Sequence, residues 1–308
     1  MGIAAKRIGK KAVKIVDSIV NWMVLVAILL LVATACYAMW DSNLVYAEAD
    51  AKQYEVYKPA EEDTASFEEL RDINREVFGW LTVYETKIDY PVVQGADNMK
   101  YVNTNARGEY SLSGAIFLDS GNRQDFADFN SILYGHHMEK QAMFGELGNF
   151  AEESFFLNHP HGNLFYEGKD HGLEFFAFVH TDVYDALTFT SNIQGEEAQR
   201  DYLDMLLTQA IHTREVDVDI QDRIVLLSTC SLDTTNGRDI LAAKISDEVF
   251  ADRFTSEITE GEHIRAETQQ GFLSRVPVWG WVLAGTVLLA LIIVIYIHRK
   301  RSKRGNTK

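Results

Sequence analysis

Two long apolar stretches stand near the ends of the chain, at residues 19–40 and 277–297. Neither contains Asp, Glu, Lys or Arg. A helix rises about 1.5 Å per residue, so each stretch would span roughly 30 Å, the thickness of a bilayer's hydrocarbon core. Tryptophans and tyrosines lie near their ends, where such rings favour the membrane interface. The pattern therefore predicts two transmembrane helices.

The first stretch has a second interpretation. Ala33-Thr34-Ala35 and Ala47-Glu48-Ala49 have the small-x-small form that a signal peptidase accepts. Cleavage there, or lipidation of Cys36, would change how the chain is attached to the membrane. We expect a retained anchor, because the uncharged stretch is longer than the apolar core of a usual signal peptide.

Between the two stretches, short apolar runs alternate with polar turns, which is typical of strands. The predicted strands are 79–83, 88–93, 114–119, 130–137, 173–180, 223–230 and 239–245. Closely spaced strands with few long helices between them predict a mainly β fold, either a sandwich or a barrel.

Helical periodicity is confined to a few segments of this central region. One helix opens at Ser66, where Glu69 completes a capping box, and its predicted face is Phe67, Leu70, Ile73 or Asn74, and Val77. Short helical pieces are expected in 143–156. A longer helix is predicted over 196–211, where apolar residues follow the 3.6-residue period.

These patterns divide the chain into seven segments. They are a basic tail (1–18), a transmembrane helix (19–40), a stalk (41–65), a catalytic domain (66–262), a linker (263–276), a second transmembrane helix (277–297) and a basic tail (298–308). Lys and Arg flank both apolar stretches on their terminal sides. The positive-inside rule then places both termini in the cytoplasm and the catalytic domain outside.

Charge excludes one class of partner. The formal net charge is −16, and because both tails are basic, the segment between the spans is more acidic still. Such a domain does not attract nucleic acid or anionic lipid. We therefore expect a membrane protein with no nucleic-acid partner.

The cysteines point to chemistry. The chain has two, Cys36 in the first apolar stretch and Cys230 at the end of the strand 223–230, so Cys230 has no plausible disulfide partner. It is either a small buried hydrophobe or a nucleophile delivered to the rim of a sheet.

A nucleophilic thiolate needs a cation beside it, an acid for the leaving group and a donor for the oxyanion. His136 follows a glycine at the end of the strand 130–137, and Arg238 opens the strand after Cys230. His137 is the alternative acid, but neighbours on a strand point to opposite faces, so only one should face the thiol. Asp233 lies close enough to Cys230 in the sequence to contact the imidazole, although a solvated turn residue is the simpler interpretation.

Other polar residues suggest binding or ligation. Thr229 and Ser231 beside the cysteine, with Ser228, are candidates for hydrogen bonds to a substrate. His159 and His161 have no third ligand at zinc-binding spacing. We expect neither a metal nor a cofactor.

These residues lie in strings that resemble the sortases, membrane-anchored cysteine transpeptidases of Gram-positive bacteria, and class B in particular. The strings are Tyr134-Gly135-His136-His137-Met138, Leu227-Ser228-Thr229-Cys230, Ile88-Asp89-Tyr90-Pro91-Val92-Val93-Gln94 and Gly114-Ala115-Ile116-Phe117-Leu118-Asp119. The resemblance implies a closed eight-stranded β-barrel with an N-terminal helix and a long helix before the penultimate strands. It also implies His136 as acid, Cys230 as nucleophile and Arg238 as the catalytic arginine.

The resemblance further implies a reaction. A sortase cleaves an LPxTG- or NPQTN-like sorting signal of a secreted surface protein after Thr, forms a thioacyl enzyme and transfers the acyl group to an amine. Three features depart from class B: Leu226 replaces the first Thr of TLxTC, the loop from Cys230 to Arg238 is short, and a second span is typical of pilin-polymerising class C enzymes. The acceptor is therefore a lipid-linked cell-wall precursor or, alternatively, a pilin lysine.

Two other functions fit the sequence less well. A papain-like cell-wall hydrolase usually places Cys before His in the chain, and here His136 precedes Cys230. A catalytically silent, membrane-tethered β-barrel serving as receptor or adhesin would leave the Cys, His and Arg set without a role.

Overall fold

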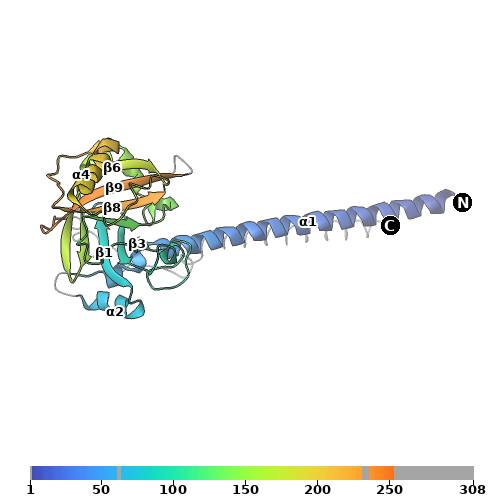
Figure 1. Cartoon of the computed structure of the whole chain (residues 1–308). Coiled ribbons are helices and arrows are strands. Elements are labelled where there is room, and N and C mark those ends of the chain that lie inside the picture. The colour runs from blue at the N-terminus through green and yellow to red at the C-terminus, as the bar shows by residue number, and fades with distance from the viewer. Residues whose placement is uncertain (1, 61–63, 231–235, 253–308) are drawn as a thin grey trace. The chain divides into compact units, whose positions relative to one another are not determined.

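The computed structural model describes residues 2–60, 64–230 and 236–252 (Figure 1). The described residues divide into two compact units, one within 2–40 and the other from residue 41 onward. The predicted second span, together with Ser231 and Asp233, lies outside the described residues. We describe each unit by itself.

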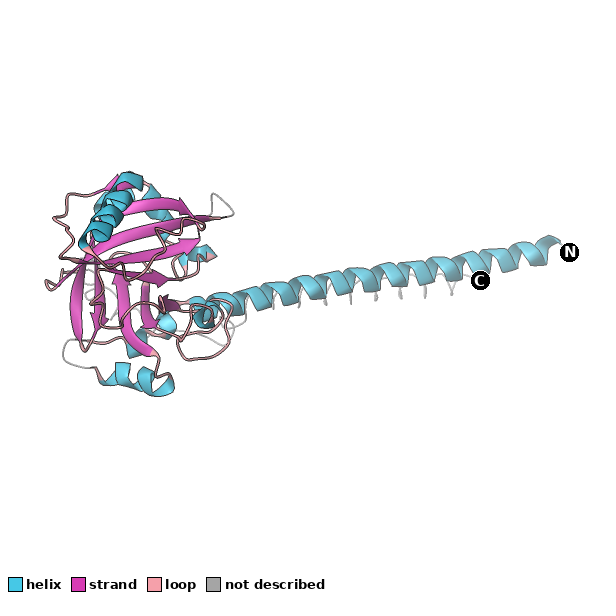
Figure 2. Cartoon of the chain, in the orientation of Figure 1, coloured by secondary structure: helices cyan, strands magenta, loops and turns pink. Residues whose placement is uncertain are grey.

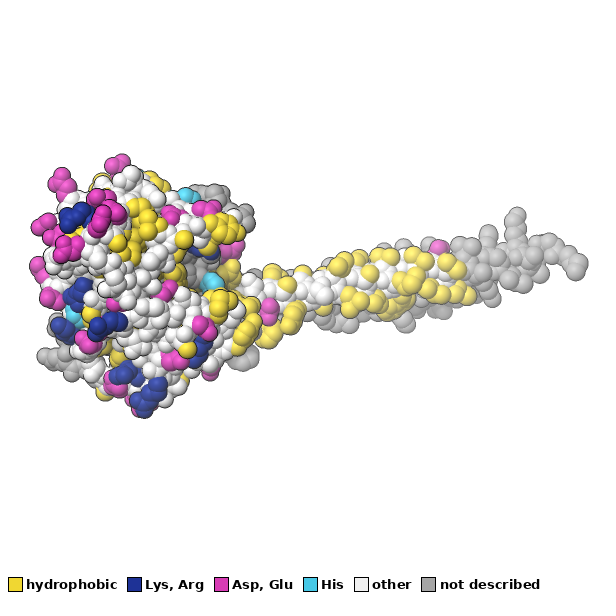
Figure 3. Space-filling view, in the orientation of Figure 1, with side chains coloured by type: hydrophobic (Ala, Val, Ile, Leu, Met, Phe, Trp, Pro, Cys, Tyr) yellow, Lys and Arg dark blue, Asp and Glu magenta, His cyan; other side chains and the backbone are white. Residues whose placement is uncertain are grey.

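Helix α1 (Gly2–Ala49) contains the first apolar stretch. Within the described residues, Lys14–Ala49 is one helix long and apolar enough to cross a membrane, and hydrophobic side chains cover the face of it seen in Figure 3. These properties fit an anchor and a signal sequence equally. The helix continues beyond residue 40, and the 3-10 helices η1 (Ala51–Gln53) and η2 (Glu55–Tyr57) follow it.

The second unit is a β-barrel (Figure 2). Its strands are β1 (Val77–Val83), β2 (Asp89–Val93), β3 (Ile116–Leu118), β4 (Asn130–Tyr134), β5 (His161–Tyr166), β6 (Lys169–Asp182), β7 (Ala210–Thr213), β8 (Arg223–Cys230) and β9 (Gly237–Ser246). The order β5-β1-β2-β3-β4-β8-β9-β6 closes through the pairing of β6 with β5, and β7 pairs with β6 outside the ring. The expected closed eight-stranded barrel is confirmed.

Strand β8 is buried on both faces. Val225 and Leu227 belong to the main core cluster, whereas Ile224 and Leu226 belong to a second cluster. Helix α4 (Glu196–Gln209) covers this second cluster with residues that include Tyr202 and Leu206. This two-sided burial explains why β8 is a continuous apolar run without alternation. The predicted long helix is confirmed, although residues 210 and 211 belong to β7.

The first helix of the barrel unit differs from its prediction. Helix α2 spans Ala65–Ile73 with Thr64 at its N-cap, and the side chain of Thr64 makes no capping hydrogen bond. The capping box of Ser66 and Glu69 is therefore wrong, because the N-cap residue is Thr64, two residues earlier. Phe67 is buried and makes an edge contact with the ring of Phe165 in β5.

The apolar face of α2 is shorter than predicted. Leu70 is buried, but Ile73 is 53% exposed and Val77 already lies in β1. The remaining short helices are η3 (Lys100–Val102), η4 (Glu139–Gln141), η5 (Leu147–Ala151) and α3 (Glu153–Asn158). The last two confirm the helical pieces expected in 143–156.

Candidate functional site

Strand pairing brings the candidate residues to one edge of the barrel. β4 and β8 are parallel neighbours with Tyr134 opposite Ser228, so His136, two residues beyond β4, and Cys230, two residues beyond Ser228, leave the sheet at the same edge. β8 and β9 are antiparallel, with Cys230 opposite Arg238. The three positions are thus adjacent in the fold although they are distant in the sequence.

A cavity of about 420 Å³ opens at this edge. His136, Ser228, Thr229 and Arg238 all line it. Its other lining residues are Asn98, Tyr101, Val102, Ala115, Phe117, Tyr134, Gly135, Val183 and Phe189. The structure therefore gathers four of the six candidate residues around one cavity and places the backbone of Cys230 beside them, while Ser231 lies outside the described residues.

The imidazole of His136 is held by a main-chain carbonyl. Its Nε2 lies 2.8 Å from the carbonyl oxygen of Val102. Because a carbonyl only accepts hydrogen bonds, Nε2 carries the proton in this contact. In the neutral ring the lone pair is then on Nδ1, which is the nitrogen left to exchange a proton with a substrate.

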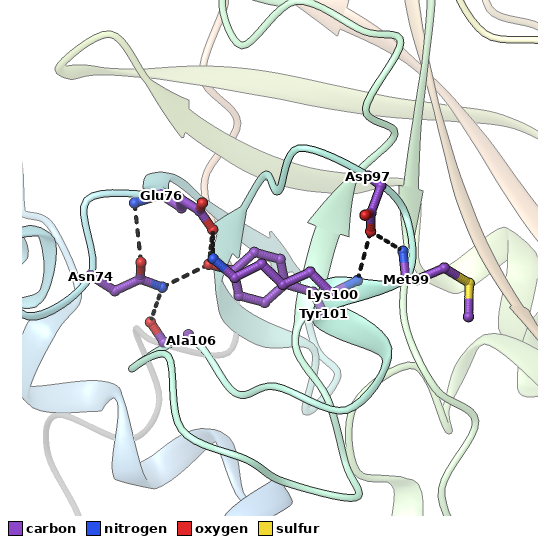
Figure 4. Close-up of polar contacts among 7 residues, drawn as sticks. All are labelled: Asn74, Glu76, Asp97, Met99, Lys100, Tyr101 and Ala106. Carbon is purple, nitrogen blue, oxygen red and sulfur yellow. Dashed lines mark hydrogen bonds and ion pairs between the residues drawn. The ribbon is translucent and has the colours of Figure 1, made fainter.

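The loop that supplies this carbonyl is anchored by a polar network (Figure 4). The Oη of Tyr101 donates to Oε2 of Glu76, and Nζ of Lys100 lies 2.6 Å from the same oxygen. Nδ2 of Asn74 donates to Oη of Tyr101 at 2.9 Å and to the carbonyl of Ala106 at 3.0 Å. The residue next to Val102 is therefore fixed from two directions.

The carboxylate of Glu76 is the charged centre of this network. Burial tends to raise its pKa, but the hydrogen bonds from Lys100 and Tyr101 outweigh burial and lower the pKa. Sequence patterns did not indicate this cluster, because its members are common residue types on separate segments.

Arg238 and two hydroxyls complete the cavity. The Nη1 of Arg238 donates to the carbonyl of Gly237 at 2.9 Å, and its guanidinium is charged at any physiological pH. Ser228 and Thr229 are each only 2% exposed, and their hydroxyls have no hydrogen-bond partner among the described residues. Unpaired buried hydroxyls are costly, so a peptide that supplies donors or acceptors here would be stabilised.

A polar wall forms another part of the cavity. The hydroxyl of Tyr134 donates to Oδ2 of Asp119 at 3.2 Å, and Nδ2 of Asn98 donates to the same oxygen at 2.7 Å. Burial, followed by the charge of Asp119, raises the pKa of Tyr134. Tyr134 therefore stays a neutral hydroxyl at the cavity surface.

The neighbouring histidine, His137, is placed differently from His136. Its Nδ1 is buried and has no hydrogen-bond partner among the described residues. Burial lowers the pKa of His137 more than the charge of Asp239 raises it. The carboxylate of Asp239 is instead paired with Nδ1 of His180 at 2.9 Å.

Comparison with known proteins adds sequence relatives, although no family model matches the chain. It is 35% identical over 189 residues to sortase B of Listeria monocytogenes, a match that covers 58% of this chain and 74% of the relative. It is 31% identical over 181 residues to sortase B of Staphylococcus aureus, with the same coverage of 58% and 74%.

Solved structures agree with these relatives. Sortase B from the type II pilus of Streptococcus pneumoniae matches with a TM-score of 0.52 and 47% identity, covering 58% of this chain and 98% of that one. A Streptococcus pyogenes class B sortase involved in pilus biogenesis matches with a TM-score of 0.55 and 39% identity, covering 59% and 98%. With this fold and these sequence relatives, the chain belongs to the class B sortases and is a cysteine transpeptidase.

Proposed function

We propose that this chain is a membrane-anchored sortase that cleaves an LPxTG- or NPQTN-like sorting signal after Thr and transfers the protein to an amine. One observation carries the proposal: the register of β4, β8 and β9 brings His136, Cys230 and Arg238 to the edge where the cavity opens. A short extended peptide fits such a cavity better than a folded substrate does.

The roles follow from the chemistry of each group. The thiolate of Cys230 attacks the Thr carbonyl, and the guanidinium of Arg238 stabilises the negative charge on the carbonyl oxygen. His136 in its imidazolium form gives the Nδ1 proton to the leaving amine as the C–N bond breaks, which leaves a thioester on Cys230. The incoming amine then returns a proton to Nδ1 and displaces the thiolate.

Substrate contacts are assigned to the hydroxyls around the cysteine. Ser228 and Thr229 are buried and unpaired in the described structure, which supports a role in hydrogen bonding to the sorting signal. We extend the same role to Ser231 from its position next to Cys230 in the sequence.

The acceptor has two candidates. The first is the amine of a lipid-linked cell-wall precursor, which a membrane-anchored enzyme encounters at the outer face of the cell membrane. The second is the lysine of a pilin. Two of the similar structures come from pilus systems, and their identities of 47% and 39% exceed the 35% and 31% of the curated sortase B proteins, which favours the second candidate.

The membrane arrangement is also part of the proposal. Helix α1 would anchor the chain through 19–40, and a second span at 277–297 would return the chain to the cytoplasm. The catalytic domain, 66–262, would then work outside the cell membrane with both termini inside.

The proposed function is tested with the full chain in lipid vesicles and two quenched peptides, one with an LPxTG signal and one with an NPQTN signal. We expect cleavage of at least one peptide, accelerated by hydroxylamine, and transfer to either a cross-bridge peptide amine or a lysine peptide, identified by mass. C230A should abolish cleavage, and H136A should reduce it by roughly 100-fold or more. H137A is the matched control and should change it little.

Two results would contradict the proposal. Full cleavage by C230A would exclude the thioacyl mechanism. If a chain that thermal unfolding shows to be folded cleaves neither peptide, a sorting signal of these two types is excluded.

A further inference from the structure

The segment after the membrane helix is built into the catalytic unit. We call residues 46–57 the stem; it comprises the end of α1 with η1 and η2. Residues from Asp41 onward belong to the same compact unit as the barrel. Ala49 and Tyr54 are 0% and 4% exposed and join the main hydrophobic core. The stem is thus packed as part of the domain.

Tyr90 in β2 connects the stem to the loop that follows His136, residues 137–143, which we call the histidine loop. The hydroxyl of Tyr90 donates to the carbonyl of Ala49 at 2.8 Å and accepts from the main-chain N–H of Met143 at 2.9 Å. The side chain is 2% exposed. One buried hydroxyl therefore joins the two segments.

A second contact between the same segments lies at the surface. The hydroxyl of Tyr46 donates to Oε2 of Glu139 at 2.8 Å. The ammonium of Lys140 lies 4.1 Å from the centre of the Tyr46 ring, which is within the range of a cation–π interaction. The stem therefore contacts the histidine loop through both the hydroxyl and the ring of Tyr46.

The histidine loop has a shape that needs outside support. Lys140, Gln141 and Met143 have φ values of 59°, 65° and 53°. This left-handed backbone region is sterically unfavourable for residues that carry a Cβ. The N–H of Phe144 donates to the carbonyl of His136 at 3.0 Å. A change in the loop's shape is therefore passed directly to the main chain of His136.

The stem also supports the other side of His136. Oε2 of Glu48 accepts from Oγ of Ser111 at 3.0 Å, and the carbonyl of Gln53 accepts from Nη2 of Arg107 at 3.1 Å. Ser111 and Arg107 lie in the connection between β2 and β3, which also contains Val102, the hydrogen-bond partner of His136. Both segments that hold the imidazole thus rest on the stem.

We propose that the stem is a positioning element for His136, acting through Tyr90 and Tyr46 on the histidine loop. The inference rests on the proposed role of His136 as the acid. A displacement of about 1 Å in a catalytic group can cost roughly 100-fold in rate. The turnover number should therefore depend on Tyr46 of the stem and on Tyr90, neither of which lines the cavity, whereas KM should not depend on them.

The test uses the full chain in vesicles with whichever quenched peptide the unaltered chain cleaves faster. Y90F removes both buried hydrogen bonds and keeps the ring, and Y46A removes the surface contact. We expect kcat to fall roughly 10- to 100-fold for Y90F and several-fold for Y46A, with KM within about twofold of the parent. Amide hydrogen exchange in 137–143 should rise in both variants.

Three further variants make the test decisive. Y57F is the matched control, because it removes a hydroxyl of the same stem that has no hydrogen bond among the described residues, and it should leave kcat and exchange unchanged. E139Q keeps an acceptor for Tyr46 and should retain most activity, whereas E139A should resemble Y46A. If Y90F fails to fold, the comparison of E139Q with E139A still tests whether the stem positions His136.

The two proposals fail in different ways. If H136A abolishes cleavage but Y90F, Y46A and E139A leave both kcat and exchange at parent values, the stem has no positioning role and the proposed function stands. If H136A retains full activity, the proposed function itself is wrong.

Discussion

At the scale of single residues, the main feature is that a main-chain carbonyl orients His136. The bond from Nε2 to the carbonyl of Val102 sets which ring nitrogen faces the chemistry. The strand ends that carry His136, Cys230 and Arg238 could be predicted from the sequence pattern, whereas the catalytic roles of these residues came from the family resemblance and stay a prediction. Val102 could not be predicted, because any residue at this position supplies the same carbonyl.

A prediction at this scale concerns Tyr101. Y101F removes the hydrogen bonds to Glu76 and from Asn74 that anchor the loop beside Val102. We expect a loss of about 1 kcal/mol in the free energy of unfolding and a drop in kcat of several-fold, because the carbonyl that holds His136 is less fixed. Peptide cleavage and chemical denaturation of the full chain measure the two effects.

The matched control is Tyr84, whose hydroxyl donates to the carbonyl of Phe250 at 2.9 Å. Tyr84 does not line the candidate cavity. Y84F should lose similar stability and keep its kcat. An equal loss of kcat in both variants would show that the effect of Y101F is general destabilisation.

At the scale of elements, both faces of β8 are covered, one by the barrel interior and one by α4. This explains why the strand could be predicted from its apolar run. β5 and β7 are not among the predicted strands. β5 begins His161-Gly162-Asn163 without apolar alternation, and β7 is a four-residue strand directly after a helix. The closed barrel therefore came from the family resemblance, and periodicity alone reached only a sandwich or barrel.

The packing of α4 gives a prediction at this scale. Leu206 is fully buried against the second core cluster, whereas its neighbour Leu207 is 38% exposed. L206A should lower the free energy of unfolding by about 2–5 kcal/mol, because it leaves a cavity behind β8. L207A should change it by about 0.5 kcal/mol or less. Chemical denaturation compares the two; equal losses would mean that α4 does not support the sheet.

At the scale of the whole molecule, the acidic barrel unit follows a helix that fits a membrane anchor. The apolar helix could be predicted because membrane thickness sets the length of a spanning helix, and its role as a retained anchor stays a prediction. The continuation of α1 to Ala49 could not be predicted, because residues 41–49 mix polar and apolar side chains and Ala49 packs into the core of the barrel unit. Their helical state depends on tertiary contacts and leaves no pattern in hydropathy.

The two-span topology that we propose predicts a protection pattern in intact cells. Protease added outside should digest the catalytic domain and leave a small protected fragment bearing an epitope tag placed after Lys308. Permeabilised cells should lose the tag as well, since both tails are then accessible. Immunoblotting of the tag measures this, and loss of the tag in intact cells would place the C-terminus outside.

The parallel neighbours β4 and β8 are separated in the sequence by α3, β5, β6, α4 and β7. Pairing them requires closing a long loop, a slow event that becomes possible only when nearly all of the barrel sequence is present. A newly emerging polypeptide therefore has its thiol and its imidazole on separate, still unpaired segments. The thiol and the imidazole can therefore meet only after β4 and β8 have paired.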